Sequence, residues 1–417
     1  MRMGRGGYLS KLYVYALLML ALYMYIYSPA LKGFSYGLDK IIFVVSVVYL
    51  LWTKQIKQGI QSFRREFRYL FGIVLTSFIV VSIHSITMSK DILMYDIFLL
   101  FEVIIVPYAF YRLFVHKFKF QIDILLFKNA FIAGLITVVL LINPAWAEIM
   151  KTQILRIPDL LLTNFYFRGF GFSDGLTFAY PVVQGFCASF IIAGMIHVKP
   201  VYYLALLPIF TSVFVNARSG LIPIFIASII VLIHSSIATK LKIISICITL
   251  LMLGSFALNS SEDNQLAESV KWGLSTFAII GDILQGKEAE NTEALFHDMV
   301  QFPDNIADWL LGTGRNIYQT YYGNYSTSDI GFCIRTVYGG IIYMFFWFGL
   351  WITMFRRCKR HNRTLAYIMF GSLLYLNWKG DFFVVNPSCR FFFFVYVLCI
   401  LDSSFLNHKL LVCKKSI

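Results

Sequence analysis

Six charged residues interrupt or border the long apolar runs of the chain, and their side chains are the best suited to chemistry. They are Arg168, Arg218, Arg315, Asp329, Arg335 and Arg390. An arginine guanidinium presents its N–H donors in a planar fork that matches phosphate oxygens. Two or three of these arginines together would therefore form a clamp for a pyrophosphate group. For any one of them, a side chain that only reaches the lipid headgroups remains the alternative.

The segments that carry the first three arginines are rich in glycine and aromatic residues. Arg168 lies in FYFRGFGFSDGLTFAY, Arg218 in the short turn NARSG, and Arg315 follows the glycines of GTGRN. Glycine permits tight turns that other residues resist. Tyr321 and Tyr322 follow Arg315 and are candidates to stack on sugar rings, with an aromatic belt at a membrane interface as the alternative.

The other charged candidates stand where predicted helices begin. Asp329 is a candidate general base, although an acidic residue at this position is equally well explained as a helix cap. Arg335 lies about a turn and a half inside the same helix, where neighbouring helices would bury it, and a buried charge needs a partner. Arg390 begins the last apolar run, and with Lys379 and Asp381 it would form a further wall of one cavity.

The elements that hold these residues are membrane helices. The 417 residues are 59% hydrophobic and 14% charged, and the mean hydropathy is +0.71. These values exclude a soluble enzyme, a secreted disulfide scaffold and a disordered chain, because soluble domains carry about 25% charged residues. The seven cysteines form no CxxC pair and have no histidine at metal spacing, so we expect packing residues, no metal and no cofactor.

About twelve apolar runs approach the length of roughly 20 residues that a helix needs to cross the hydrocarbon core. They predict an all-α polytopic bundle, because every backbone polar group in a span must be satisfied internally. The fifth, seventh and eleventh runs are short. The predicted spans are Leu9–Tyr27, Leu38–Trp52, Tyr69–Thr87, Ile97–Val115, Ala130–Asn143, Leu176–Ile196, Val201–Val215, Ser219–Ser236, Ile243–Leu258, Gly331–Phe355, Thr364–Asn377 and Phe391–Leu406.

The distribution of charge predicts which connections face the cytoplasm. The net charge of +14 comes largely from Lys and Arg gathered at both termini and in alternate connections, at 54–68, 112–119, 240–242 and 356–363. This positive-inside pattern places both termini in the cytoplasm and argues against a nucleic-acid partner. The long connection 259–330 falls on the opposite face and holds 11 of the 22 acidic residues.

We therefore expect three parts. Residues 1–258 contain transmembrane helices 1 to 9 with an outer loop at 144–175, residues 259–330 form a large extracytoplasmic loop, and residues 331–417 contain transmembrane helices 10 to 12 and a cytoplasmic C-terminus. Because little but short connectors lies on the other face, the chemistry is expected at the extracytoplasmic side.

Smaller features complete the expected organisation. Lys54–Arg68 is predicted to be an amphipathic helix on the cytoplasmic leaflet, with a plain polar connector as the alternative. Leu266–Leu284 and Thr292–Val300 are predicted amphipathic helices of the large loop. Glu102 and Lys128 interrupt apolar runs at inner or middle depth, and we expect structural pairs or inner-leaflet anchors there.

The order and spacing of the motifs resemble those of the bacterial O-antigen polymerases, the Wzy-type enzymes of the O-antigen ligase and polymerase superfamily. RGFGFSD at 168–174 is similar to the family's outer-loop segment, and NARSG at 216–220 is similar to its arginine turn. GTGRN, SDIGF and VYGGIIY, between 312 and 343, are similar to its third block. The resemblance extends to the topology of the whole chain, although the motifs occupy only about 50 residues.

This resemblance implies a GT-C-like glycosyltransferase of the bacterial inner membrane. Such an enzyme joins oligosaccharide repeat units carried on undecaprenyl pyrophosphate into O-antigen or a related surface polysaccharide, with no metal and no cofactor. Arg168 and Arg218 would contact pyrophosphate, assisted by Arg315, Arg335 and Arg390, and Asp329 would be the base. The expected partners are the lipid-linked oligosaccharide, membrane lipids and a chain-length regulator protein.

Three alternatives remain open at this stage. An O-antigen ligase of the same superfamily typically carries a His-Asn pair where this sequence has Ser328 and Asp329, which favours a polymerase. A lipid-linked oligosaccharide flippase has a similar number of spans, but its two halves should be related and its substrate residues should lie near the midplane. The third alternative is a non-catalytic assembly partner.

Overall fold

The fold was obtained as a computed structural model, which describes residues 5–34, 37–84, 90–157, 171–173, 175, 178–196, 200–234, 237, 240, 299–317, 328–382 and 384–406. Within these ranges the regular structure is helical, apart from one β-bridge between Leu31 and Leu155. The chain is therefore an all-α protein over its described part.

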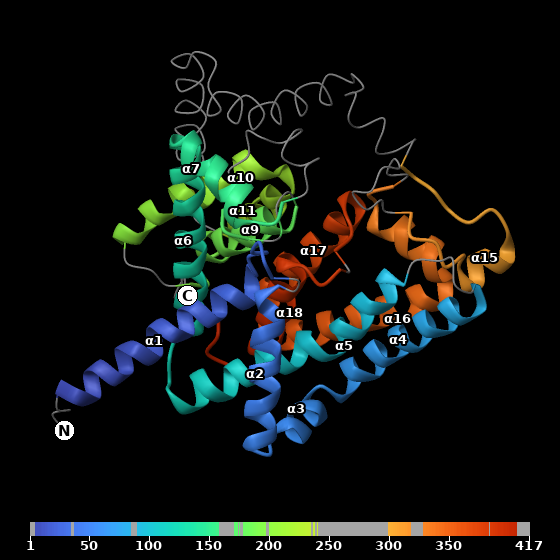
Figure 1. The fold of residues 1–417 in the computed structure, drawn as a ribbon, viewed down its shortest axis with the longest axis horizontal. Coiled ribbons are helices and arrows are strands. Elements are labelled where there is room, and N and C mark those ends of the chain that lie inside the picture. The colour runs from blue at the N-terminus through green and yellow to red at the C-terminus, as the bar shows by residue number, and fades with distance from the viewer. Residues whose placement is uncertain are drawn as a thin grey trace, which may run out of the picture.

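Figure 1 shows how the helices of the described residues are arranged. The first half contains α1 (Arg5–Ile26), α2 (Leu38–Trp52), α3 (Ile56–Ser62), α4 (Arg64–His84), α5 (Asp91–Phe110), the π-helix η1 (Tyr111–Lys117), α6 (Ile122–Ile142), α7 (Pro144–Ile149) and the π-helix η2 (Met150–Ile154). The second half contains α9 (Ala179–Ile192), the 3-10 helix η3 (Pro200–Ala205), α10 (Leu206–Asn216), the 3-10 helix η4 (Arg218–Gly220), α11 (Leu221–His234), α15 (Ile306–Leu311), α16 (Gly331–His361), α17 (Arg363–Lys379) and α18 (Pro387–Leu401).

Four helical segments are long and apolar enough to cross a membrane: α4, α5 with η1, α6 and α16. Five further apolar helices, in α1, α9, α10, α11 and α18, have between 10 and 17 residues. These helices identify an all-α membrane protein by their length and composition. The predicted span Ile243–Leu258 and the predicted loop helix Leu266–Leu284 lie outside the described residues, as does Thr292–Val300 apart from its last two positions.

Two groups of helices pack side by side, and α18 lies between them (Figure 1). In the first group α6 contacts α9 and α10, and α9 also contacts α10 and α11. In the second group α4 contacts α5 and α16, and α16 contacts α17. Helix α18 contacts α5 and α16 on one side and α9 on the other.

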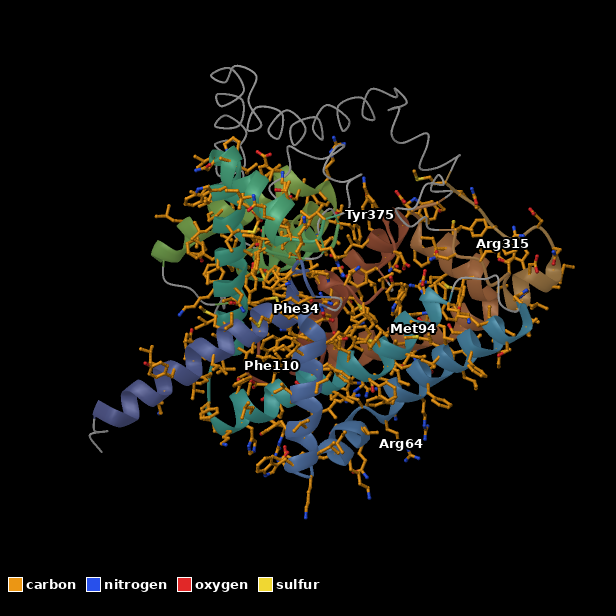
Figure 2. The ribbon with its side chains drawn as sticks, in the orientation of Figure 1. Phe34, Arg64, Met94, Phe110, Arg315 and Tyr375 are labelled. Atoms are coloured by element: carbon orange, nitrogen blue, oxygen red, sulfur yellow. The ribbon has the colours of Figure 1, made fainter. Side chains whose placement is uncertain are left out.

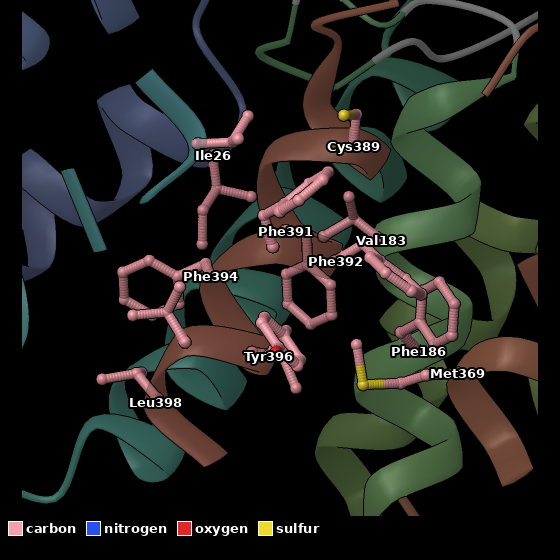
Figure 3. Packing of buried hydrophobic residues seen from close by; sticks show 14 of the residues in the cluster. Ile26, Val183, Phe186, Met369, Cys389, Phe391, Phe392, Phe394, Tyr396 and Leu398 are labelled. Carbon is pink, nitrogen blue, oxygen red and sulfur yellow. The ribbon is translucent and has the colours of Figure 1, made fainter. Parts of the chain in front are cut away.

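From Phe391 onward helix α18 is apolar on every face, and a helix of this kind must be enclosed by other elements. Every residue from Pro387 to Cys399 is buried. Figure 3 shows the aromatic side chains of α18 reaching the facing helices: Phe391 stacks on Phe186 of α9 with 5.9 Å between ring centroids. On another side, Tyr396 meets Phe63 edge to face at 6.2 Å. The run of four phenylalanines thus joins the two groups.

Helix α16 is interrupted at Gly340, where φ is +67°. Such a break deprives the carbonyl groups of the preceding turn of their helical donors. The GTG segment supplies the missing donors, because the Thr313 N–H donates to the Val337 carbonyl at 2.7 Å and the Gly314 N–H donates to the Tyr338 carbonyl at 3.0 Å. The motifs GTGRN and VYGGIIY are therefore two halves of one structural unit.

The first glycine of GTG cannot be replaced without strain. Gly312 has φ of +75°, and a Cβ atom there would lie 2.1 Å from the Tyr338 carbonyl oxygen. The His84 Nε2 atom lies 2.9 Å from the Gly312 carbonyl oxygen, which attaches the end of α4 to the same segment. This close approach of two backbones is a reason for glycine at this position.

The turn NARSG packs directly on α9. A Cβ atom on Gly185 would lie 1.9 Å from the Gly220 carbonyl oxygen, and a Cβ atom on Gly220 would lie 2.3 Å from the Pro181 carbonyl oxygen. Contact between backbones at this distance requires glycine on both sides. Helix α9 therefore fixes the position of the turn that carries Arg218.

The prediction of one amphipathic helix over Lys54–Arg68 was wrong in part. Helix α3 ends at Ser62, and the residues from Arg64 onward belong to α4. Phe63, at the junction, is fully buried against Tyr396, whereas Ile60 is exposed. The apolar side chain that seemed suited to lipid instead anchors the turn between α3 and α4 in the core.

Replacement of Gly185 by alanine is expected to destabilise the bundle by about 1–3 kcal/mol, because the added methyl group meets backbone that cannot rotate away. The thermal midpoint of the purified protein in detergent measures this effect. Gly371→Ala is the matched control, since a Cβ atom at this helical position has only ordinary contacts with Ile226. An unchanged midpoint for Gly185→Ala would contradict the close packing of α9 on the turn.

Candidate functional site

Arg218 opens the turn between α10 and α11. The turn is formed by local hydrogen bonds: the Gly220 N–H donates to the Ala217 carbonyl at 3.2 Å, and the Asn216 amide donates to the Ser212 carbonyl at 2.8 Å. Ser219 and Gly220 are buried and Arg218 is half-buried. Burial lowers the pKa of the Arg218 guanidinium from its ordinary value. The protein thus keeps a cation partly out of water at this turn.

A second cation, Lys379, lies near enough to Arg218 for the two charges to interact. Lys379 is the last residue of α17, a helix that contacts α11. Burial lowers the pKa of the Lys379 ammonium, and the positive charge of Arg218 lowers it further. Two cations that repel each other in a half-buried place are stabilised by a bound anion. Arg218 and Lys379 are therefore the centre of the candidate site.

The connection after Lys379 is held by a buried ion pair. Asp381 accepts two hydrogen bonds from Arg335, at 3.3 Å from Nε and 2.8 Å from Nη2. The backbones of the two segments also approach each other closely, since a Cβ atom on Gly331 would lie 2.8 Å from the Gly380 carbonyl oxygen. Arg335 thereby fixes the end of α17 against the start of α16, and with it the position of Lys379.

Arg335 also contacts a carboxylate on α5. Its Nη1 atom lies 3.7 Å from Asp96 Oδ1 and donates to the Tyr343 hydroxyl at 3.2 Å. The Tyr343 hydroxyl in turn donates to Asp96 at 2.9 Å, and Ser77 of α4 donates to the same carboxylate. Arg335 and Asp96 are closed off from solvent. The prediction that Arg335 is buried and has a partner is confirmed.

Arg390 belongs to a separate buried cluster. Its Nη1 atom lies 3.1 Å from Oδ2 of Asp39, the second residue of α2. Lys40 lies 2.8 Å from the same oxygen and also pairs with Glu102 of α5, and Ser28 donates to Asp39. The expected cavity wall of Arg390 with Lys379 and Asp381 stays a prediction; the structure shows that Arg390 pairs with Asp39, whereas Asp381 pairs with Arg335.

The charged residues predicted at inner or middle depth are structural pairs, as expected. Glu102 pairs with Lys40, and Lys128 donates to the Tyr15 hydroxyl at 2.9 Å while lying 5.0 Å from the centre of that ring. A further pair that sequence reasoning did not single out joins Glu66 of α4 to Arg357 of α16 at 2.7 Å. These pairs satisfy charges that an apolar bundle would otherwise leave buried alone.

The remaining predicted residues lie outside the described ranges, just beyond the GTG segment or at the start of α16. Arg168, Tyr321 and Tyr322 lie outside the described residues. Arg315 is exposed just beyond the GTG segment, and Figure 2 shows it apart from Arg64. Asp329 is half-buried and directly precedes Ile330, the cap residue of α16. It stands beside Ser328, whose hydroxyl donates to the Met299 carbonyl at 2.6 Å.

Sequence reasoning missed Asp39 and Asp96 as partners of the arginines. Asp96 stands alone in the apolar run LMYDIFLL, and Asp39 stands with Lys40 in LDKIIFVV; an acid inside an apolar run was an available signal. An intramembrane acid predicts a basic partner, but spacing along the chain does not say which one. Within the described residues, no three His, Cys, Asp or Glu side chains gather as metal ligands would.

Comparison of the chain with protein-family models, with curated proteins and with solved structures finds no match. The site must therefore be interpreted from its own geometry, which offers two half-buried cations supported by a buried network.

Replacement of Arg335 by methionine is expected to lower the free energy of unfolding by about 3–5 kcal/mol, because it leaves two carboxylates without their cation. Thermal unfolding in detergent measures the loss. Arg315→Met removes the same charge from an exposed position and should leave the midpoint nearly unchanged. Equal midpoints for the two variants would show that the Arg335 network does not support the fold.

Removal of the Arg218 charge is expected to raise the pKa of Lys379 toward its ordinary value, since a like charge lowers it. Only the neutral amine reacts with acetylating reagents, so Lys379 in Arg218→Gln should be labelled more slowly at a fixed alkaline pH. Mass spectrometry of the Lys379 peptide measures the rate, with the exposed Arg64→Gln as control. Faster labelling in Arg218→Gln would contradict the proximity of the two cations.

Proposed function

We propose that the protein polymerises undecaprenyl-pyrophosphate-linked oligosaccharide repeat units into O-antigen or a related surface polysaccharide. The proposal places the reaction on the outer face of the bacterial inner membrane, in a multi-pass protein with both termini in the cytoplasm. Its main support is the pair of half-buried cations formed by Arg218 of the NARSG turn and Lys379 at the end of α17. The order of the polymerase-like motifs along the sequence supports it further.

The cation pair fits the leaving group of such a reaction. When the glycosidic bond to the lipid carrier breaks, negative charge accumulates on the departing pyrophosphate. Two cations fixed in advance, on different helices and partly shielded from water, stabilise that charge better than flexible surface lysines. The guanidinium of Arg218 contributes a bidentate fork, and the Lys379 ammonium contributes a compact charge.

The acceptor hydroxyl needs a base, and Asp329 is the proposed one. It lies at the start of α16, the helix whose Arg335 fixes the connection that follows Lys379. Arg335 acts in this proposal as a positioning residue, because its guanidinium is bound to Asp381 and shielded from solvent. Arg390 has the same role for the junction of α2 and α18, through Asp39.

Arg218→Ala is expected to abolish chain extension without loss of the protein from the membrane. The assay is a gel of surface polysaccharide from a strain that lacks the gene, complemented with each variant and normalised to protein level. Lys379→Gln should reduce chain length strongly and Arg218→Lys partly. Arg64→Ala is the matched control, because Arg64 is exposed at the start of α4.

The pattern on the gel separates the candidate activities. A single repeat unit on the lipid core, with a long ladder restored only by the wild-type protein, supports a polymerase. A core without any unit would contradict the proposal. In that case long chains retained on the lipid carrier would identify a ligase, and their absence a flippase. A full ladder of polysaccharide from the Arg218→Ala strain would show that the Arg218–Lys379 pair is not needed for polymerisation.

A further inference from the structure

An apolar groove of about 520 Å³ lies on the surface of α6, α7 and η2, away from the cation pair. Every residue that lines it is apolar, including Ile132, Ile136 and Val139 of α6, Trp146 of α7 and Ile154 of η2. Several of these side chains are exposed, among them Val139 and Trp146. Soluble proteins rarely expose an apolar hollow of this kind, whereas a membrane protein presents it to hydrocarbon.

The length of the groove along α6 is close to the thickness of one membrane leaflet. Its lining on α6 runs from Ile132 to Leu140, which corresponds to about 12 Å at the rise of an α-helix. Half of a hydrocarbon core of about 30 Å has a similar length. Helix α6 is itself among the helices long and apolar enough to cross a membrane, and Trp146 lies just beyond its last turn.

Three cations gather around η2, beside Ile154 at the edge of the groove. The Lys32 backbone N–H donates to the Ile154 carbonyl at 2.9 Å, and the Lys32 ammonium donates to the Thr152 carbonyl. Lys151 belongs to η2 itself and is buried, and burial lowers its pKa to about 8. Arg156 follows η2, and its Nη1 atom donates to the Phe34 carbonyl at 3.3 Å.

The charge around η2 is predominantly positive. Glu148 is the one acidic residue of α7 and η2, and it is exposed. A positive cluster beside an apolar groove complements a molecule with a negative head and a hydrocarbon tail. The shape and the charge of this region therefore select the same kind of ligand.

We propose that this groove binds one acyl chain of an anionic phospholipid, whose phosphate contacts Lys32, Lys151 and Arg156. A polyprenyl carrier chain would extend well beyond a groove of one leaflet's depth, which favours a phospholipid as the occupant. The site is separate from the Arg218–Lys379 pair and does not depend on the proposed function.

The test uses the intact protein in phosphatidylcholine nanodiscs that contain a small fraction of phosphatidylglycerol brominated on its acyl chains. Bromine quenches tryptophan fluorescence at contact, and the difference between the wild-type protein and Trp146→Phe isolates the signal from the groove. Brominated phosphatidylglycerol is expected to quench Trp146 at a several-fold lower mole fraction than brominated phosphatidylcholine. Equal quenching by the two lipids would overturn the proposal.

Two pairs of variants separate the head from the tail. Lys32→Gln with Arg156→Gln removes two exposed charges and should weaken the preference for phosphatidylglycerol by about 30-fold, while Lys57→Gln with Arg64→Gln removes two exposed charges elsewhere and should not. Val139→Phe fills the groove and should reduce quenching by both lipids. Ile142→Phe, on the same helix but outside the lining, is its control.

Two results would overturn the assignment of the occupant. Unchanged quenching in both groove variants would show that Trp146 contacts only bulk lipid. Displacement of brominated phosphatidylglycerol by stoichiometric polyprenyl phosphate, but not by excess unlabelled phosphatidylglycerol, would show that the groove belongs to the carrier lipid.

Discussion

The need to neutralise arginine in an apolar interior determines how the helices around the site are joined. Arg335 is closed off from solvent and contacts carboxylates from α5 and from the connection between α17 and α18. An unpaired charge at this depth would cost several kcal/mol, so these elements cannot separate without a large penalty. The same constraint operates through Arg390, which joins the start of α18 to the start of α2. Both contacts lie at helix ends, where the candidate anion site is also found.

Packing in the interior depends on α18 and on small residues at close contacts. The phenylalanines of α18 fill the space between two helix groups, and Gly185 and Gly220 allow α9 to approach the turn that bears Arg218. The large aromatic side chains fill the wide gap between the two helix groups. The glycines, which have no side chain, permit the backbone contact that brings the cation Arg218 to a defined position.

Composition and hydrophobic run length were sufficient to predict an all-α membrane bundle, and the predicted run Leu38–Trp52 coincides with α2. The position of Arg335, about a turn and a half inside a predicted helix, was sufficient to predict that its side chain is buried and paired. Its partners could not be named, because Asp96 and Asp381 lie far from it in the sequence and no periodicity relates them. The break at Gly340 was equally hidden, since VYGG looks like an ordinary small-residue segment until GTG is placed beside it. Tertiary contacts, and not local propensity, decide both features.

The hydrogen bonds between GTG and α16 close the intervening chain into a ring. Gly314 is bonded to Tyr338, so Arg315 and Asp329 lie on a segment whose two ends are attached to the same half of one helix. A group tethered in this way stays at a high effective concentration near its attachment point. A ligand held at the start of α16 would therefore meet Arg315 and Asp329 without a search through solution. The entropic cost of bringing these side chains to the helix is met during folding rather than in each encounter with a ligand.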